Sequence, residues 1–170
     1  YDNIGDMANT GIEVVLNGDI VRTKNVVWSL SANLTWVKNK VLSLPETSRD
    51  MEVDGHWGFV NGSTFIAEGL PLGTYFLPEY AGLNEYGDSQ WWDYTPKYDA
   101  DGNEIEGEWN KVGDYPNNIT GDNKSKKLFG TSQPKVFGGF GTSLYAYGFD
   151  FSIAFDYQLG GVIYDGSYAG

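Results

Sequence analysis

Residues 26–36 alternate between apolar and polar side chains, and this run constrains the fold more than any other part of the sequence. Only Val27 breaks the alternation. A repeat of two residues is typical of a β-strand, and this run is about twice as long as the usual strand of roughly five or six residues. Tilted by about 40°, it climbs roughly 25 Å, which matches the apolar band of an outer-membrane β-barrel. The apolar positions are Val26, Trp28, Leu30, Ala32, Leu34 and Trp36, and the polar ones are Ser29, Ser31, Asn33 and Thr35.

Residues 149–159 repeat this pattern. Large apolar side chains occupy every second position, and Asp150 and Asp156 lie on the other face. In a membrane barrel the carboxylates face a water-filled lumen, while the apolar side chains face lipid. Soluble β-sandwiches also alternate, but the length of the runs and the size of the apolar side chains favour the barrel. The predicted lipid-facing residues are Trp28, Leu30, Leu34, Trp36, Phe151, Ile153 and Phe155.

Two weaker alternating runs complete a set of four strands. Residues 12–20 precede the first strong run, and residues 135–147 precede the second. Residues 22–25 are expected to form a tight turn within the first pair, and Gly148 marks a tighter turn within the second. The predicted fold class is therefore all-β, with four antiparallel strands of a large transmembrane β-barrel.

Residues 38–133 form a long connection between the two strand pairs and are rich in Gly, Pro, Asn and Asp. This composition predicts an irregular loop in which helices are short or absent. Outer-membrane barrels have short periplasmic turns and long extracellular loops, so we expect the connection to lie outside the cell. The barrel strands then occupy 1–37 and 134–161, and 162–170 begin the next extracellular loop. Because the chain opens at Tyr1 without an initiator Met or a signal peptide, we expect a piece of a longer protein.

The composition excludes several classes of function. The 23 acidic and 11 basic side chains give a formal charge of -12, which repels nucleic acid. The chain has no Cys and a single His, which excludes Cys-based and His-rich metal sites. No apolar run approaches the 18 residues or so of a transmembrane helix. Motifs for nucleotide binding, zinc binding and serine nucleophiles are also absent, so we predict neither an enzyme nor a cofactor.

Four aromatic residues of the loop, Trp91, Trp92, Tyr94 and Trp109, are candidates for a ligand or partner surface. Sugar rings stack on aromatic faces, and aromatic residues are enriched at protein interfaces. The alternative is that these side chains pack together and hold the loop in shape.

Asp99, Asp101 and Asn103 offer closely spaced oxygen ligands of the kind that Ca²⁺ binds. The glycine of this stretch falls at the fourth position, whereas the EF-hand loop needs it at the sixth. A solvated hairpin turn is therefore favoured, and we predict no metal site.

Lys124, Lys126 and Lys127 cluster shortly before the third strand. Ammonium groups bind phosphate oxygens well, so this cluster is a candidate for contact with lipopolysaccharide phosphates. A solvated patch on the loop is the equally supported alternative.

A set of short motifs stands in a fixed order along the chain. They include Asn9-Thr10-Gly11-Ile12-Glu13, Asn39-Lys40-Val41-Leu42-Ser43-Leu44, Glu68-Gly69-Leu70-Pro71-Leu72-Gly73, Tyr80-Ala81-Gly82-Leu83 and Gly148-Phe149-Asp150-Phe151-Ser152. In this order they resemble the C-terminal barrel region of SusC/RagA-type TonB-dependent outer-membrane transporters. The resemblance covers almost the whole chain.

This resemblance implies a barrel of about 22 strands in the bacterial outer membrane, closed by an N-terminal plug. It implies coupling to the TonB complex through parts of the protein that are not in this chain. It also implies a SusD-like surface lipoprotein as partner. The implied function is import of nutrients, either oligosaccharides (glycans) or peptides. The alternative function is a soluble carbohydrate-binding β-sandwich, in which a second sheet must cover the apolar strand faces.

Overall fold

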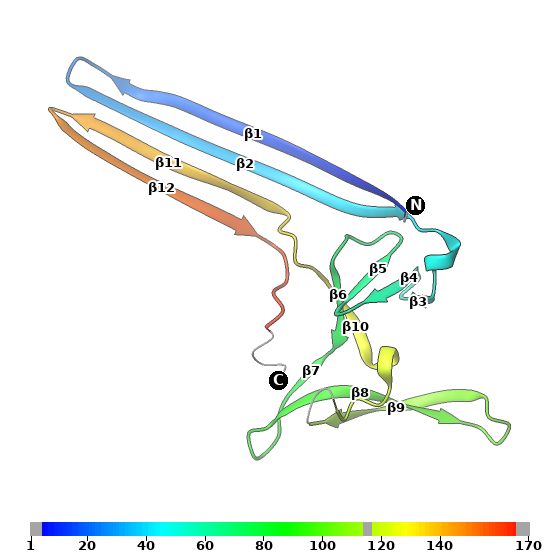
Figure 1. Ribbon diagram of the computed structural model, residues 1–170. Helices are drawn as coiled ribbons and strands as arrows, with labels where there is room; N and C mark the ends of the chain where they lie inside the picture. The colour runs from blue at the N-terminus through cyan, green and yellow to red at the C-terminus, as the bar shows by residue number, and fades with distance from the viewer. Residues whose placement is uncertain (1–4, 114–116, 166–170) are drawn as a thin grey trace.

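The computed structural model describes residues 5–113 and 117–165, and most of these residues lie in β-strands (Figure 1). Within the described residues, the strands form three antiparallel sheets of four, five and three strands. The four-stranded sheet extends away from the other two: the five-stranded sheet adjoins one of its ends, and the three-stranded sheet lies beyond the five-stranded one (Figure 1). The all-β fold class predicted from the sequence is confirmed.

The four-stranded sheet contains the two strong and the two weak alternating runs. Its strands are β1 (Asp6–Arg22), β2 (Val26–Ser43), β11 (Val136–Ala146) and β12 (Phe149–Leu159), in the spatial order β1-β2-β11-β12. β11 lies beside β2 although the long connection separates them in sequence. β1 and β2 are 17 and 18 residues long, whereas β11 and β12 have 11 residues each. The first hairpin therefore extends beyond the second.

The register of this sheet places most of the large apolar residues of all four strands on one side. Ala32 of β2 lies opposite Leu16 of β1 and Phe140 of β11. Phe140 in turn lies opposite Phe155 of β12, and their rings stack with centroids 5.0 Å apart. Residues directly opposite each other in antiparallel strands project from the same face. The four strands thus share one continuous surface, which we call the apolar face.

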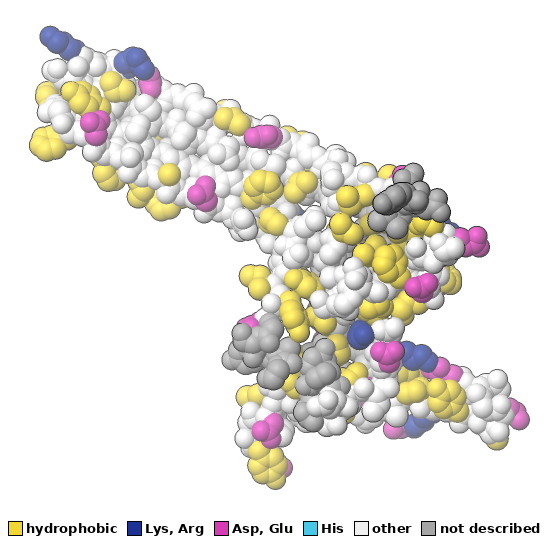
Figure 2. Space-filling view, viewed as in Figure 1, with side chains coloured by type: hydrophobic (Ala, Val, Ile, Leu, Met, Phe, Trp, Pro, Cys, Tyr) yellow, Lys and Arg dark blue, Asp and Glu magenta, His cyan; other side chains and the backbone are white. Residues whose placement is uncertain are grey.

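The opposite face of the sheet is mainly polar, although Val15, Phe137 and Tyr145 also lie on it. Ser29 of β2 lies opposite Asp19 of β1 and Ser143 of β11. Ser143 lies opposite Ser152 of β12, and Ser29 Oγ donates a 2.6 Å hydrogen bond to Asp19 Oδ1. In Figure 2 the side of this sheet turned to the viewer is mostly uncharged polar surface and backbone, with scattered acidic side chains. The sheet therefore has one face suited to lipid and one suited to water.

No described part of the chain covers the apolar face. The exposed fractions are 41% for Leu34, 48% for Phe155 and 59% for Phe151. In a soluble sandwich such residues are buried against a second sheet about 10 Å away. The five-stranded sheet adjoins the end of the long hairpin, and the three-stranded sheet lies beyond it, away from the apolar face (Figure 1). Within the described residues, the cover that the soluble alternative requires is missing.

Both hairpin turns of the four-stranded sheet are short. In the first, Thr23 N donates to Val26 O over 2.7 Å, and Val26 N donates to Thr23 Oγ1 over 3.0 Å. In the second, Tyr147 and Gly148 have φ values of 50° and 90°. Positive φ at two successive turn residues is typical of the type I′ hairpin, whose twist matches that of the strands. Both turns lie at the same end of the sheet (Figure 1).

The long connection is more ordered than the irregular loop that the sequence predicts. The five-stranded sheet consists of β3 (Met51–Val53), β4 (His56–Asn61), β5 (Thr64–Ala67), β6 (Thr74–Pro78) and β10 (Lys126–Thr131), and the three-stranded sheet of β7 (Tyr80–Leu83), β8 (Ser89–Tyr98) and β9 (Glu104–Val112). The strands of the larger sheet are only three to six residues long. Glycine turns separate them, such as Gly55 and Gly62 with φ of 80° and 60°. Strands this short hold too few alternating positions to be recognised in a sequence.

Helices play little part in this connection, as the sequence predicts. Residues 5–113 and 117–165 contain two short 3-10 helices, η1 (Glu46–Ser48) and η2 (Asp122–Ser125). In the described ranges no helix has the length and apolar character needed to span a membrane.

Residues 68–72 attach the five-stranded sheet to the long hairpin. Beyond the end of β11 this segment lies beside β2: Val41 N donates to Leu70 O, and Gly69 N donates to Val41 O, both over 2.9 Å. The side chain of Asn39 also accepts a 2.7 Å hydrogen bond from the backbone N of Leu72. The long hairpin and the folded connection are therefore joined by backbone hydrogen bonds and not only by the continuous chain.

Candidate functional site

Three of the four candidate aromatic residues share one face of the hairpin formed by β8 and β9. Trp92 lies opposite Lys111, and Tyr94 lies opposite Trp109. Every second residue of a strand projects to the same side, so Trp92 and Tyr94 point together. The rings of Tyr94 and Trp109 lie 5.4 Å apart, and Tyr94 Oη accepts a 2.8 Å hydrogen bond from Gly107 N. We call Trp92, Tyr94 and Trp109 the aromatic cluster.

Two lysines place their ammonium groups over indole rings of this cluster. Lys111 Nζ lies 5.2 Å from the ring centroid of Trp92, and Lys127 Nζ lies 5.2 Å from that of Trp109. Such cation–π contacts contribute about 0.5–1 kcal/mol at exposed sites. Lys127 also forms an ion pair with Glu79. Packing therefore holds the cluster in place, while Trp109 stays 44% exposed and accessible to a partner or ligand.

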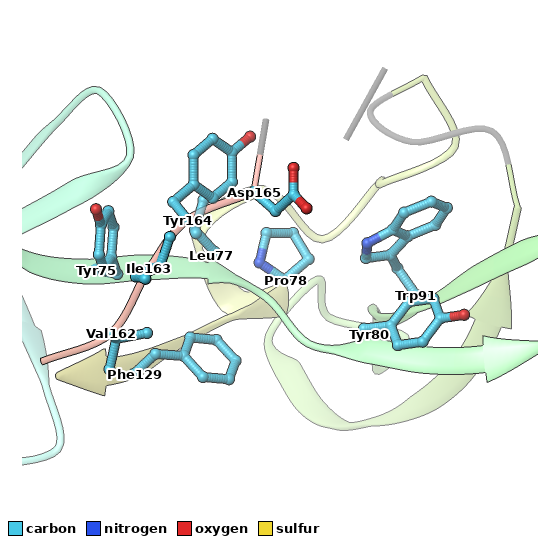
Figure 3. Close-up of a pocket in the computed structure, with 10 residues that line it drawn as sticks. All are labelled: Tyr75, Leu77, Pro78, Tyr80, Trp91, Phe129, Val162, Ile163, Tyr164 and Asp165. Carbon is cyan, nitrogen blue, oxygen red and sulfur yellow. The ribbon is translucent and has the colours of Figure 1, made fainter. Parts of the chain in front are cut away.

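Trp91 projects from the other face of β8 and lines a separate cavity of about 350 Å³ (Figure 3). Its ring meets that of Tyr80 edge to face, with centroids 5.9 Å apart. Segment 162–165, which follows β12, closes one side of the cavity. There the ring centroids of Tyr164 and Tyr75 lie 6.1 Å apart. No local pattern in the sequence indicates this cavity, because its walls come from segments that are far apart in the sequence. The lining residues are Tyr75, Leu77, Pro78, Tyr80, Trp91, Phe129, Val162, Ile163, Tyr164 and Asp165.

Asp93 is a buried carboxylate that fastens β8 to the segment around η2. It is 1% exposed and accepts hydrogen bonds of 2.5–3.1 Å from Thr120 N and Oγ1, Gly121 N and Ser125 Oγ. Burial alone raises the pKa of Asp93, but the hydrogen bonds outweigh it and hold that pKa below its ordinary value. The sequence gives no sign of this contact, because the partners lie 27–32 residues away.

Asp99, Asp101 and Asn103 form the tip of the hairpin between β8 and β9. Asp99 Oδ1 accepts hydrogen bonds from Asn103 N over 2.8 Å and from Asp101 N over 3.0 Å. The hydrogen bonds, that from Asn103 N foremost, lower the pKa of Asp99. Across residues 5–113 and 117–165, no three or more His, Asp or Glu side chains gather as metal ligands. The carboxylate of Asp99 stabilises the turn.

The residues predicted to face lipid all lie on the apolar face of the four-stranded sheet. Trp28 lies opposite Leu144, which lies opposite Phe151. Trp28 Nε1 donates a 2.8 Å hydrogen bond to Thr142 Oγ1, so the only donor of the indole ring is satisfied within the sheet. The ring can therefore lie against apolar surroundings without leaving a polar group unpaired. The set comprises Trp28, Leu30, Leu34 and Trp36 of β2 and Phe151, Ile153 and Phe155 of β12.

The curated proteins that are similar to this chain are TonB-dependent receptors, although no protein-family model matches it. TonB-dependent receptor P3 of Formosa agariphila is 29% identical over 164 residues, and receptor P39 of the same organism is 27% identical over 194 residues. TonB-dependent receptor SusC of Bacteroides thetaiotaomicron is 26% identical over 163 residues. Each alignment covers 95% of this chain, but the chain spans only 15–18% of the length of these relatives.

Two solved structures share the fold. The RagAB peptide transporter has a TM-score of 0.64 at 24% identity, and the RagAB peptide importer in its closed-closed state has a TM-score of 0.61 at 23% identity. Each match covers 93% of this chain and 16% of the other chain. The four strands are thus an unclosed part of a larger barrel fold. The resemblance to SusC/RagA-type transporters that the sequence motifs indicate is confirmed.

Proposed function

We propose that this chain forms part of the wall and of the extracellular structure of a TonB-dependent importer in the outer membrane. In this proposal the strands of residues 1–37 and 134–161 belong to the wall, and residues 38–133 lie outside the cell. Residues 162–165 begin the next extracellular loop, and residues 166–170, assigned with them, lie outside the described residues. The plug and the segment that contacts the TonB complex belong to other parts of the protein.

The observation that carries this proposal is the apolar face without a covering sheet. From Val26 to Trp36, β2 presents apolar side chains over roughly 30 Å of strand, which corresponds to an apolar band about 25 Å tall when the strand is tilted. Trp28 and Trp36 lie near the two ends of this stretch, where interfacial aromatic residues belong. The polar face would then line a water-filled lumen.

The shape of the molecule supports the orientation. Both short turns lie at one end of the four-stranded sheet. The five-stranded and three-stranded sheets of the connection lie beyond the other end (Figure 1). Outer-membrane barrels keep short turns in the periplasm and long loops outside. We therefore assign the end with the folded connection to the extracellular side.

A test with the isolated segment separates this proposal from the soluble sandwich. Residues 1–170 expressed alone without detergent are expected to aggregate or oligomerise, because the outer edges of β1 and β12 and the apolar face all remain open. Size-exclusion chromatography with light scattering measures the outcome, and the same segment in detergent micelles is the control. A monodisperse monomer in plain buffer would favour the carbohydrate-binding sandwich.

We further propose that the imported nutrient is an oligosaccharide or a peptide, delivered by a SusD-like surface lipoprotein. The names of the similar proteins, SusC and the RagAB peptide transporter, support this class of function, and none of them denotes an enzyme. The aromatic cluster is the surface that we propose for docking the lipoprotein. Aromatic side chains are enriched at interfaces, and Trp109 of the cluster is 44% exposed.

Replacing Trp92 and Trp109 with Ala together is expected to weaken capture of the lipoprotein by roughly tenfold or more, because buried tryptophans dominate interface energies. Co-purification of the lipoprotein with the full-length transporter measures the effect. Trp57→Ala, at an exposed tryptophan of β4, is the matched control and should change nothing. Equal recovery of the lipoprotein with the double variant would remove the cluster as docking surface and turn attention to the cavity at Trp91 as a substrate site.

A further inference from the structure

Most cations in the extracellular part of this acidic chain already have a partner. Lys111 lies over the ring of Trp92 and donates to the carbonyl of Ala81. The remaining contacts are ion pairs: Arg49–Glu68, Lys97–Glu108, Lys124–Glu104, Lys126–Asp122 and Lys127–Glu79. The cluster Lys124, Lys126 and Lys127, a sequence candidate for phosphate contacts, is therefore neutralised by its own neighbours.

Three lysines differ from this pattern. Among the described residues, no carboxylate lies within ion-pair distance of Lys38, Lys40 or Lys135. All three are exposed, and all three line a single cavity of about 470 Å³. This volume lies within the range of small-molecule sites, about 300–1,000 Å³. In a chain with twelve more acidic than basic side chains, the gathering of these unpaired cations marks the cavity as positive.

The course of the strands explains why the cavity exists. The backbone pairing on this side of β2 ends one residue beyond Val136, where Val37 N donates a 3.0 Å hydrogen bond to Lys135 O. The segment around Leu70 resumes the pairing beside β2 only at Val41. Between these two points β2 has no strand on that side, which leaves a notch. The connection from β10 to β11, including Gln133, forms the rest of its wall.

The position of the cavity relative to the apolar face is also defined. Lys38 and Lys40 follow Trp36 at intervals of two residues in a regularly paired strand, so they project from the same face as Trp36. Lys135 continues the strand one residue beyond Val136, with Lys135 O accepting a 3.0 Å hydrogen bond from Val37 N, so it lines the cavity from the polar side. Trp36 lies at the extracellular end of the apolar stretch and itself lines the cavity. Lys38 and Lys40 therefore stand just above the apolar band, at the level where lipid headgroups begin.

We propose that this cavity binds the phosphate group of an outer-leaflet lipid headgroup. The inference rests on the proposed function, since it uses the barrel's orientation in the membrane. The ammonium groups of Lys38 and Lys40 supply charge-assisted hydrogen bonds to phosphate oxygens, and basic pockets at membrane interfaces recognise anionic headgroups in this way. The indole of Trp36 packs beside the headgroup at the membrane boundary.

Binding of lipid A to the purified full-length transporter, followed by native mass spectrometry, tests the site. The wild type is expected to bind phosphorylated lipid A at least tenfold more tightly than dephosphorylated lipid A. The double variant Lys38→Gln and Lys40→Gln should bind both forms equally, and replacing the same two lysines with Arg should preserve the preference. The matched control is Lys124→Gln and Lys126→Gln, which removes the same charge from the neutralised cluster and should behave as the wild type.

Two results would overturn the inference. One is a Gln double variant that keeps the preference for phosphorylated lipid A. The other is that inorganic phosphate alone binds the wild-type protein as tightly as phosphorylated lipid A does. This result would indicate a site for free anions. Failure of the proposed function looks different: the wild-type protein would then not insert into outer-membrane lipid at all. Insertion is scored separately, by heat-modifiable migration on gels.

Discussion

Replacing Leu34 with Arg is expected to destabilise the membrane-inserted protein by about 1–3 kcal/mol, because Leu34 lies two residues inside Trp36 and the cost of a cation on the lipid face falls from about 2–4 kcal/mol at the membrane centre to about 0–1 kcal/mol near the interface. Leu34 lies on the apolar face and is 41% exposed where no other part of the described chain covers it. An arginine there must carry its charge into hydrocarbon or distort the bilayer to keep it hydrated. Reversible unfolding of the full-length protein from lipid vesicles in denaturant measures the change.

The neighbouring position supplies the matched control. Thr35 projects from the polar face and lies directly opposite Glu13 of β1, so Thr35→Arg gains an acidic neighbour across the strands. We expect this variant to change stability by less than about 1 kcal/mol. Equal losses at both positions would mean that the two faces have the same surroundings, which a barrel wall does not allow.

The four strands of the wall could be predicted from the sequence because a barrel repeats one local rule. Each strand needs only an alternation of two residues, which is visible in the sequence even without its partners. The register follows from the same rule: a shift of one residue would move residues such as Phe155 from the apolar face to the polar face. The observed pairing of Phe155 with Phe140 and of Phe140 with Ala32 is the arrangement that keeps them together.

The rest of the molecule depends on contacts that no local pattern reveals. Trp91 and Trp92 are neighbours in sequence, but they project from opposite faces of β8. Trp91 lines the cavity and Trp92 belongs to the aromatic cluster, and this assignment requires knowing that β8 is a strand. The lysine cavity arises because β11 stops at Val136 and another segment continues beside β2 from Val41. Such sites follow from the meeting of distant segments, which alternation does not encode.

The buried carboxylate of Asp93 is such a long-range contact, and its removal is expected to have a large local effect. In Asp93→Ala, the donors Thr120 N, Gly121 N and Ser125 Oγ lose their acceptor. Hydrogen bonds to charged groups contribute about 1.5–3 kcal/mol each, so we expect a local loss of about 3 kcal/mol or more. Amide hydrogen exchange at Thr120 and Gly121 should then accelerate by roughly a hundredfold, since each 1.4 kcal/mol is a factor of ten.

The exposed hairpin tip provides the control for this prediction. Asp99 is also a carboxylate that accepts backbone hydrogen bonds, but it holds only its own turn. Asp99→Ala should accelerate exchange at the tip and leave Thr120 and Gly121 protected. Unchanged exchange at these two amides in Asp93→Ala would show that other contacts hold η2 against β8.

The pH dependence of the same contact follows from the direction of the pKa shift. The folded-state pKa of Asp93 is lowered, so its stabilising contribution is fully present above the unfolded value of about 3.9. The contribution is lost as pH falls through the lower, folded-state pKa. After correction for intrinsic exchange rates, protection of Thr120 and Gly121 should therefore stay constant from pH 7 to about 4.5 and decline only below about pH 4. Asp93→Ala should show no such decline, because the titrating group is gone. A wild type whose protection already falls between pH 7 and 5 would mean that a different group, and not the carboxylate of Asp93, holds the segment.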